Sequence, residues 1–281
     1  MKANRINAQG ATKRAILVTL GIILLTALVV GICITYSKLH DIWVEQCEIV
    51  DVAKQVRITT GQYIKEGVIL EKFGLRKGAN LALIDFRKKR EEILGDVPNI
   101  RELKIERHLP ERVEILVEER VPIARLWEKD SKTRSYRVVD SDGVVFDRAR
   151  GTGLLPIIYE SPKSVTPIGK RLTGRARAAL SLLELARTAP FTDMPILDAD
   201  TTPTDFILST LGNYDKAKIA WTSMDEPTAT TQECLTRQLR HLHDAFTTGI
   251  ARTSGPTPHP IIWNAVIPGK KVYANTKEPI Q

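Results

Sequence analysis

The first long apolar stretch of the chain predicts a membrane-spanning helix. Ala15–Tyr36 contains no charged residue and is rich in Ile, Leu and Val. A helix of this length, at ~1.5 Å per residue, reaches about 33 Å and crosses a hydrocarbon core of about 30 Å. A cleaved signal peptide would have a shorter apolar core and then a small-x-small cleavage site, and no such site follows Tyr36. We therefore expect an uncleaved anchor at residues 15–36 rather than a signal peptide or a buried core helix.

Charge predicts the orientation of this anchor. Residues 1–14 carry four basic residues and no acidic one, whereas the segment after the span, Lys38–Glu45, has mixed charge. Because basic flanks tend to stay on the cytoplasmic side, we expect residues 1–14 in the cytoplasm and residues 37–281 outside it. Half of the net charge of +8 is then a topogenic signal, and nucleic acid is not an expected partner.

Residues 55–118 alternate between helical and strand periodicity. The pattern predicts a strand at 55–59, a helix at 64–73 that ends at Gly74, a helix from the N-cap Asp85 to about Leu94, and strands at 100–107 and 113–118 around a turn at 108–111. Two helices can cover one face of such a small three-stranded sheet. We expect an α+β module.

The pattern changes from residue 122 onward. Short strands are predicted at 123–127, 135–139, 144–146, 196–197, 205–210, 217–221, 261–267 and 271–274, with amphipathic helices at 172–187 and 232–247. Asp142-Gly143 is a strong hairpin signal. We expect a mostly antiparallel sheet that carries two helices, and an α+β fold class for the whole chain.

These patterns divide the chain into five predicted parts. They are a basic tail at 1–14, a transmembrane helix at 15–36, the α+β module at 45–121, the β-rich domain at 122–276 and a short tail at 277–281.

The sequence lacks the common signatures of catalysis and of metal binding. It has no nucleophile elbow, no metalloprotease helix motif and no phosphate-binding loop. Cys33, Cys47 and Cys234 are widely spaced and form no zinc-ligand pair. His241 and His243 are two residues apart, which places them on different sides of a helix rather than on one chelating face. We expect no catalytic residue, no cofactor and no metal site.

Arg87-Lys88-Lys89-Arg90 is the densest basic run after the tail. Glu91 and Glu92 follow it directly, which is typical of the solvated face of a helix. A contact with anionic lipid headgroups or with an acidic partner remains open.

The last predicted strand suggests a protein-binding edge. If Val272–Ala274 lies at the edge of the sheet, its free backbone groups can accept a strand from another protein. The alternative is an edge that Lys270 and Lys271 protect and that binds nothing.

The order of these parts resembles the FtsQ/DivIB family of bacterial cell-division proteins. The motifs that carry the resemblance are Gly74-Leu75 with Gly78-x-Asn80-Leu81, Pro98-Asn99-Ile100, Arg107-x-x-Pro110, Ile115-x-Val117-x-Glu119-Arg120-x-Pro122-x-Ala124 and Asp140-x-x-Gly143-x-x-Phe146. They cover residues 37–146. Later in the chain, the family's Asp-Leu-Arg is replaced by Asn264-Ala265-Val266.

The resemblance implies that residues 45–121 form a POTRA domain and that the protein is a non-enzymatic divisome scaffold in the inner membrane at the division septum. It also implies FtsB-like and FtsL-like coiled-coil partners, with an FtsB-like segment added as a strand to the C-terminal sheet edge. The contacts carried over to this chain are Ile267, Lys271, Val272, Tyr273 and Ala274. A POTRA-containing envelope assembly adaptor and a membrane-anchored extracytoplasmic enzyme are the alternatives.

Overall fold

The structure is a computed structural model. It describes residues 3–132, 135–148, 151–212, 214–220, 229–247, 262–265 and 273–275. Within these ranges, side chains are described except at 3–23, 229–231, 246 and 273–275. The chain forms two compact units, Met1–Glu91 with Leu103–Val117 and Glu92–Glu102 with Glu118–Gln281.

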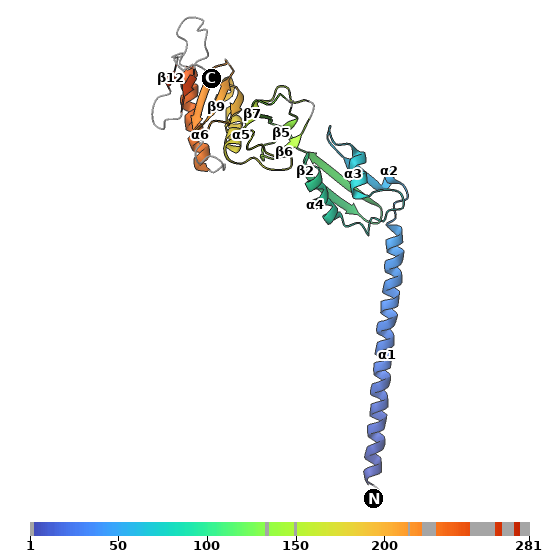
Figure 1. Ribbon diagram of the computed structural model, residues 1–281. Helices are drawn as coiled ribbons and strands as arrows, with labels where there is room; N and C mark the ends of the chain where they lie inside the picture. Colours follow the sequence, from blue (N-terminus) through green and yellow to red (C-terminus); the bar gives the residue numbers. More distant parts are fainter. Residues whose placement is uncertain are drawn as a thin grey trace. The chain divides into compact units, whose positions relative to one another are not determined.

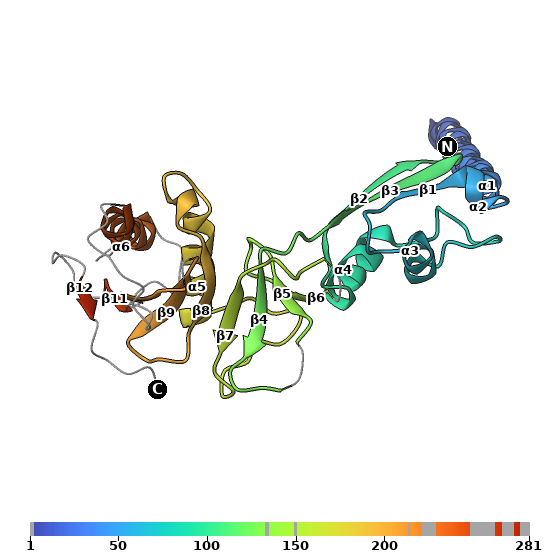
Figure 2. The same cartoon turned by 90° about the horizontal axis from the view of Figure 1, so that it is seen from above.

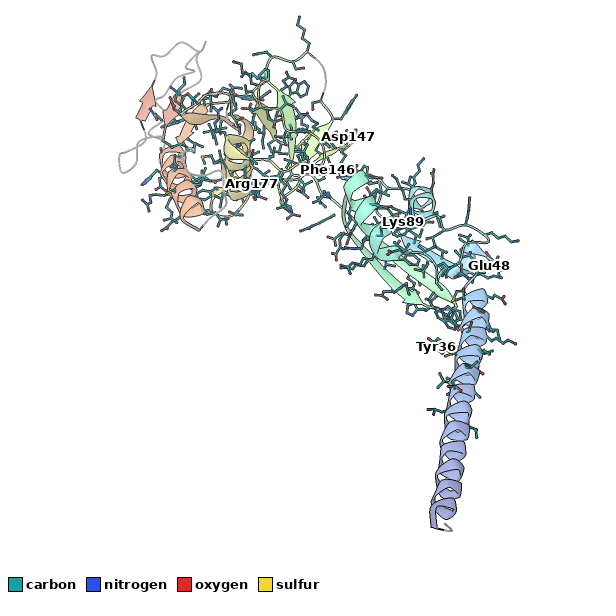
Figure 3. The ribbon with its side chains drawn as sticks, turned by 60° about the horizontal axis from the view of Figure 1, so that its bottom comes forward. Tyr36, Glu48, Lys89, Phe146, Asp147 and Arg177 are labelled. Carbon is teal, nitrogen blue, oxygen red and sulfur yellow. The ribbon has the colours of Figure 1, made fainter. Side chains whose placement is uncertain are left out.

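The first unit begins with one continuous helix, α1 (Ala3–Gln46), shown in Figure 1. Among the residues whose side chains are described, Leu24–Gln46 is the helical segment long and apolar enough to cross a membrane. Its apolar side chains are exposed, and Tyr36 projects from the helix in Figure 3. An exposed apolar helix fits the predicted membrane anchor. The helix is longer than the predicted span at both ends, because residues 3–14 and 37–46 continue it.

A small α+β arrangement follows α1. Its elements are α2 (Val52–Gln55), β1 (Val56–Thr59), α3 (Glu66–Phe73), α4 (Phe86–Asp96), β2 (Ile100–His108) and β3 (Arg112–Glu119). The three strands form a sheet in the order β1-β3-β2, with β1 parallel to β3. Figure 2 shows α3 and α4 on the same side of this sheet. The predicted order of strand, helix, helix, strand and strand is confirmed, whereas the single turn α2 was not predicted.

Local signals in the sequence explain the helix ends. Gly74 takes the left-handed conformation with φ 73° and caps α3. The side chain of Asp85 accepts a hydrogen bond of 3.0 Å from the backbone N–H of Lys88 at the start of α4. Behind these caps, Phe73 and Phe86 are buried with their ring centroids 5.7 Å apart. The caps therefore set where each helix begins or ends, and the contact between the two buried rings packs the helices together.

The loop between α3 and α4 holds the end of α1. The side-chain amide of Asn80 donates to the backbone O of Val44 at 2.7 Å. The backbone N–H of Gly78 donates to Ile49 O and that of Leu81 to Cys47 O, both at 2.9 Å. Cys47 and Ile49 are fully buried. The predicted Gly78-x-Asn80-Leu81 motif thus attaches the exit of the apolar helix to the domain that follows it.

The second unit contains a nine-stranded sheet. Its strands are β4 (Ala124–Glu128), β5 (Arg137–Val139), β6 (Val145–Asp147), β7 (Ile157–Glu160), β8 (Ile196–Asp200), β9 (Phe206–Leu211), β10 (Lys216–Ala220), β11 (Ile262–Asn264) and β12 (Tyr273–Asn275). Their order across the sheet is β12-β11-β10-β9-β8-β7-β4-β5-β6. The strand β7 was not predicted from the sequence.

The sheet is mixed and mostly antiparallel, as predicted, since five of its eight described strand pairs are antiparallel. The pairs β4–β7, β7–β8 and β10–β11 are parallel, and the other described neighbours are antiparallel. For the β7–β8 and β10–β11 pairs, the physical reason lies in the two long helices. Helix α5 (Gly174–Ala186) connects β7 to β8, and α6 (Ala229–Thr247) lies between β10 and β11. A helical crossover returns the chain in the same direction and so produces a parallel pair.

One hydrophobic core unites these helices with one face of the sheet. Buried side chains of α5, such as Leu180 and Leu183, pack in the same cluster as Leu239 of α6 and Ile158 of β7. The predicted amphipathic faces of both helices are therefore confirmed as core faces. The short 3-10 helix η1 (Phe191–Asp193) adds the buried Phe191.

Candidate functional site

The C-terminal strand lies at one end of the nine-stranded sheet. In the described chain, β12 has a single strand neighbour, β11. The two strands are antiparallel, with Ile262 opposite Asn275, Trp263 opposite Ala274 and Asn264 opposite Tyr273. An end strand paired on one side offers its other side to a further strand. This edge is the candidate protein-binding site.

The strand next to this edge is held by burial and by hydrogen bonds. Trp263 of β11 is buried, and its indole N–H donates to Oδ2 of Asp215 at 3.3 Å. The backbone N–H of Ala265 donates to Lys218 O at 2.9 Å, which continues the parallel pairing of β11 with β10. A strand added to β12 would thus join a sheet whose preceding strand is fixed by a buried aromatic side chain.

The opposite edge of the sheet is covered by the chain itself. At β6, the backbone N–H of Val145 donates to Lys170 O at 2.9 Å, and the N–H of Gly169 donates to Val145 O at 2.8 Å. Val144 and Arg171 form an isolated antiparallel bridge beside them. Within the described residues, the two ends of the sheet therefore differ as docking edges.

The structure describes part of the predicted contact set. Tyr273 and Ala274 lie on β12, in register with Asn264 and Trp263. Ile267, Lys271 and Val272 lie outside the described residues. The sequence did not indicate that β11 pairs with β10, because the two strands are far apart along the chain. It therefore did not indicate the hydrogen bond from Trp263 to Asp215 that supports the edge.

The two histidines of α6 have different surroundings. His243 lies 2.9 Å through Nε2 from Oδ1 of Asp193, and its ring meets that of Phe191 edge-on at 5.9 Å. His241 is exposed. The predicted divergence of their side chains is confirmed, and His243 joins α6 to η1.

Two members of the basic run on α4 make contacts within their own unit. Arg87 Nε lies 3.7 Å from Glu91 Oε1, and its side chain is 90% exposed. Arg90 Nε donates to the backbone O of Leu103 on β2 at 2.8 Å. These contacts are typical of a solvent-exposed helix face. The long side chain of Arg90 also reaches the neighbouring strand β2.

A charged cluster occupies the face of the nine-stranded sheet away from the core. Lys129 Nζ donates to Oδ2 of Asp200 at 2.7 Å, and the ammonium lies 5.2 Å from the ring centroid of Tyr159. Burial by itself would raise the pKa of Asp200, but hydrogen bonds from Lys129 and Thr202 outweigh it and lower that pKa. Burial likewise would lower the pKa of Lys129, yet Asp200 raises it. Both shifts move away from neutral pH, so this pair stays charged and is not tuned for proton transfer.

Comparison with known proteins agrees with this architecture. Residues 53–120, which contain β1 to β3 and the two helices between them, match the family model for the POTRA domain of the FtsQ type. A segment of 94 residues is 27% identical to the cell division protein DivIB of Clostridium acetobutylicum. This match covers 34% of the present chain and 36% of that relative, so the chain spans about a third of the length of the curated protein it matches.

The FtsQ-type POTRA match, the similarity to DivIB and the apolar N-terminal helix, which fits a membrane anchor, together support the assignment of this chain to the FtsQ/DivIB family.

Proposed function

We propose that this protein is a non-enzymatic scaffold of the bacterial cell-division machinery. The FtsQ-type POTRA domain and the name of the DivIB relative support a role in division. The apolar segment of α1 supports attachment to the inner membrane. The basic residues at 1–14 favour a cytoplasmic N-terminus, with the POTRA domain and the β-rich domain outside the cytoplasm at the septum.

The proposed partners are FtsB-like and FtsL-like coiled-coil proteins. An FtsB-like segment would add as a strand along β12. The observation that carries this proposal is the position of β12 at the end of the sheet order, with β11 as its single strand neighbour in the described chain. The hydrogen bonds between β6 and residues 169–170 make the other end a poorer acceptor. Strand addition takes its affinity from backbone hydrogen bonds and its specificity from alternate side chains.

The proposed contact residues are those of the last turn and strand. They are Ile267, Lys271, Val272, Tyr273 and Ala274. Tyr273 would be the main contact, because an aromatic side chain offers a large area at low entropic cost. Lys271 would pair with an acidic residue of the partner. The POTRA domain would serve a separate contact, through which other divisome proteins bring the scaffold to the division site.

A co-purification experiment tests the edge. The variant Tyr273→Ala with Val272→Pro removes the aromatic ring and one backbone donor, and we expect it to lose the FtsB-like partner in detergent extracts. Tyr214→Ala is the matched control, since Tyr214 is 72% exposed on the turn between β9 and β10 of the same sheet. Equal recovery of the partner with both variants would exclude β12 as the interface.

Cellular localisation tests the wider role. A fluorescent fusion at the N-terminus should form bands at mid-cell, and depletion of the protein should give filamentous cells. A uniform membrane signal together with normal division would contradict the scaffold proposal.

A further inference from the structure

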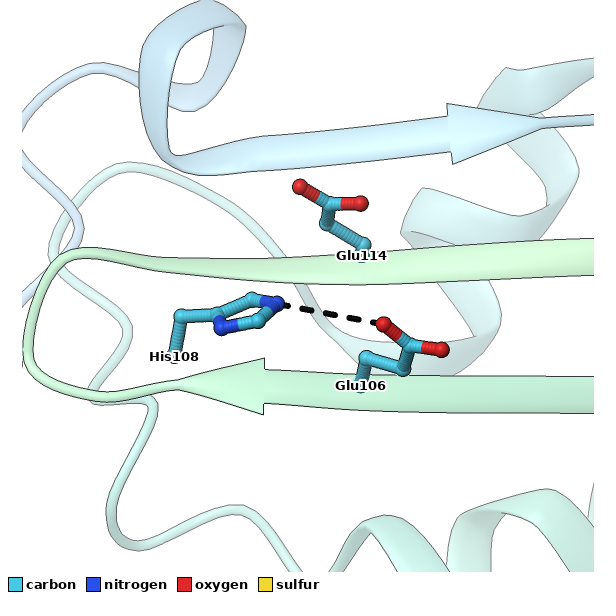
Figure 4. A group of neighbouring side chains, drawn as sticks. All are labelled: Glu106, His108 and Glu114. Atoms are coloured by element: carbon cyan, nitrogen blue, oxygen red, sulfur yellow. Dashed lines mark ion pairs between the residues drawn. The ribbon is translucent and has the colours of Figure 1, made fainter.

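Three potential metal ligands converge on the surface of the POTRA sheet. They are Glu106 and His108 of β2 and Glu114 of β3, drawn in Figure 4. One ligand atom from each lies within 4.8 Å of the others. Glu106 and His108 are exposed, and Glu114 is half-buried. None of the three residues is a fixed position of the family motifs, since His108 is a variable position of Arg107-x-x-Pro110, and none belongs to the C-terminal edge.

The strand geometry explains this convergence. Residues two apart on a strand point to the same face, so β2 presents Glu106 and His108 together. On β3, the neighbours Val113 and Ile115 are buried against the helices, which leaves Glu114 on the opposite face. The turn between β2 and β3 sets the register that brings the third ligand alongside the first two. The backbone of one hairpin thereby positions the whole set.

We propose that Glu106, His108 and Glu114 bind a divalent transition-metal ion of the zinc class. Zinc accepts imidazole nitrogen and carboxylate oxygen as ligands and is usually four-coordinate, so three protein ligands leave one position for water or for a ligand from another protein. Calcium and magnesium prefer sets made only of oxygen atoms. The imidazole in this set therefore favours zinc.

Neighbouring cations compete with such an ion. Arg112 Nε lies 3.0 Å from Oε1 of Glu114. Within the ligand set itself, His108 Nε2 lies 3.9 Å from Oε2 of Glu106. Arg57 and Lys104 line the same hollow of about 340 Å³ as Glu106 and Glu114. Arg112 and a bound cation would share the carboxylate of Glu114 and would repel each other there, so removal of Arg112 should favour binding.

A bound ion would join β2 to β3 close to their turn. Because its ligands come from two strands, it would oppose separation of the hairpin and would do so independently of the edge at β12.

Titration of the full-length protein in detergent with zinc alone, followed by calorimetry, tests the site. We expect one saturable zinc equivalent. His108→Gln should weaken binding at least about tenfold, a loss no smaller than that from removing outer-shell partners of metal ligands. Glu106→Gln and Glu114→Gln should act in the same direction. Arg112→Gln should strengthen binding, because it releases Glu114.

His241→Gln is the matched control, as it removes an exposed histidine on α6 and should leave zinc binding unchanged. The side chain of His108 is 47% exposed, and circular dichroism melts will show that the variants keep their fold. The absence of saturable binding would overturn the proposal. Equal affinities for His108→Gln and His241→Gln, or weaker binding by Arg112→Gln, would also overturn it.

Discussion

Arg120 and Asp140 form a short, buried ion pair in the second unit. Nη1 of Arg120 lies 2.5 Å from Oδ2 of Asp140, and the two side chains are 15% and 5% exposed. The other carboxylate oxygen accepts from the backbone N–H of Val144 at 2.8 Å, and Arg120 Nε donates to Pro98 O at 2.9 Å. Three of the motifs that resemble those of the FtsQ/DivIB family therefore meet at one cluster.

Replacing Arg120 should destabilise this cluster strongly. Removal of one partner leaves a buried charge unpaired, which costs roughly 3–5 kcal/mol. We expect Arg120→Ala to raise the rate of amide hydrogen exchange in β5 and β6, measured on the full-length protein by mass spectrometry. Arg87→Ala is the control, because its exposed pair with Glu91 contributes about 0.5 kcal/mol or less. Similar exchange in the two variants would show that the pair does not stabilise the cluster.

The pair of Asp200 and Lys129 should make the second unit sensitive to acid. The pKa of Asp200 is lower in the folded protein, so its contribution to stability is present above the unfolded value of about 3.9 and is lost as the pH falls through the folded value. We expect the difference in unfolding free energy between the wild type and Asp200→Asn to be constant above about pH 5 and to shrink below about pH 4. Urea unfolding at a series of pH values measures it, and a difference that grows on acidification would contradict this sign.

Sequence patterns were sufficient to predict the helices and strands of the POTRA domain, because the residues that mark their ends lie close to them in the sequence. Gly74 and Asp85 mark helix ends whatever the rest of the chain does. The strand β7 was missed because Ile157 and Ile158 are adjacent and break the alternation by which half-buried strands are found. The parallel pairs β7–β8 and β10–β11 depend on which strands α5 and α6 connect, and that information is not local.

The edge at β12 and the proposed metal site also differ in how far the sequence alone predicts them. An edge at the last strand could be predicted because Val272–Ala274 ends the series of strands along the chain. The proposed metal site could not, since Glu114 joins Glu106 and His108 only in the register of the folded hairpin. Alternation predicts which face a strand residue occupies, but the register decides which residue lies beside it.

Asn80 should control access to the buried thiol at the exit of α1. Cys47 is fully buried, burial raises its thiol pKa, and its Sγ lies 3.4 Å from the backbone O of Trp43. The hydrogen bond from Asn80 to Val44 O ties the same helix end to the loop. Loss of one such bond costs about 1 kcal/mol, which corresponds to a roughly fivefold higher population of the locally open state.

Maleimide labelling of the full-length protein, in a Cys33→Ser background, measures this opening. We expect Asn80→Ala to raise the labelling rate of Cys47 about fivefold, as a bond of about 1 kcal/mol predicts. Cys234 on α6 belongs to the other unit and is the internal control, so its labelling rate should not change. Unaltered labelling of Cys47 would show that the apolar contacts of Cys47 and Ile49 hold the helix exit without Asn80. Faster labelling of both thiols would instead indicate general loosening of the fold.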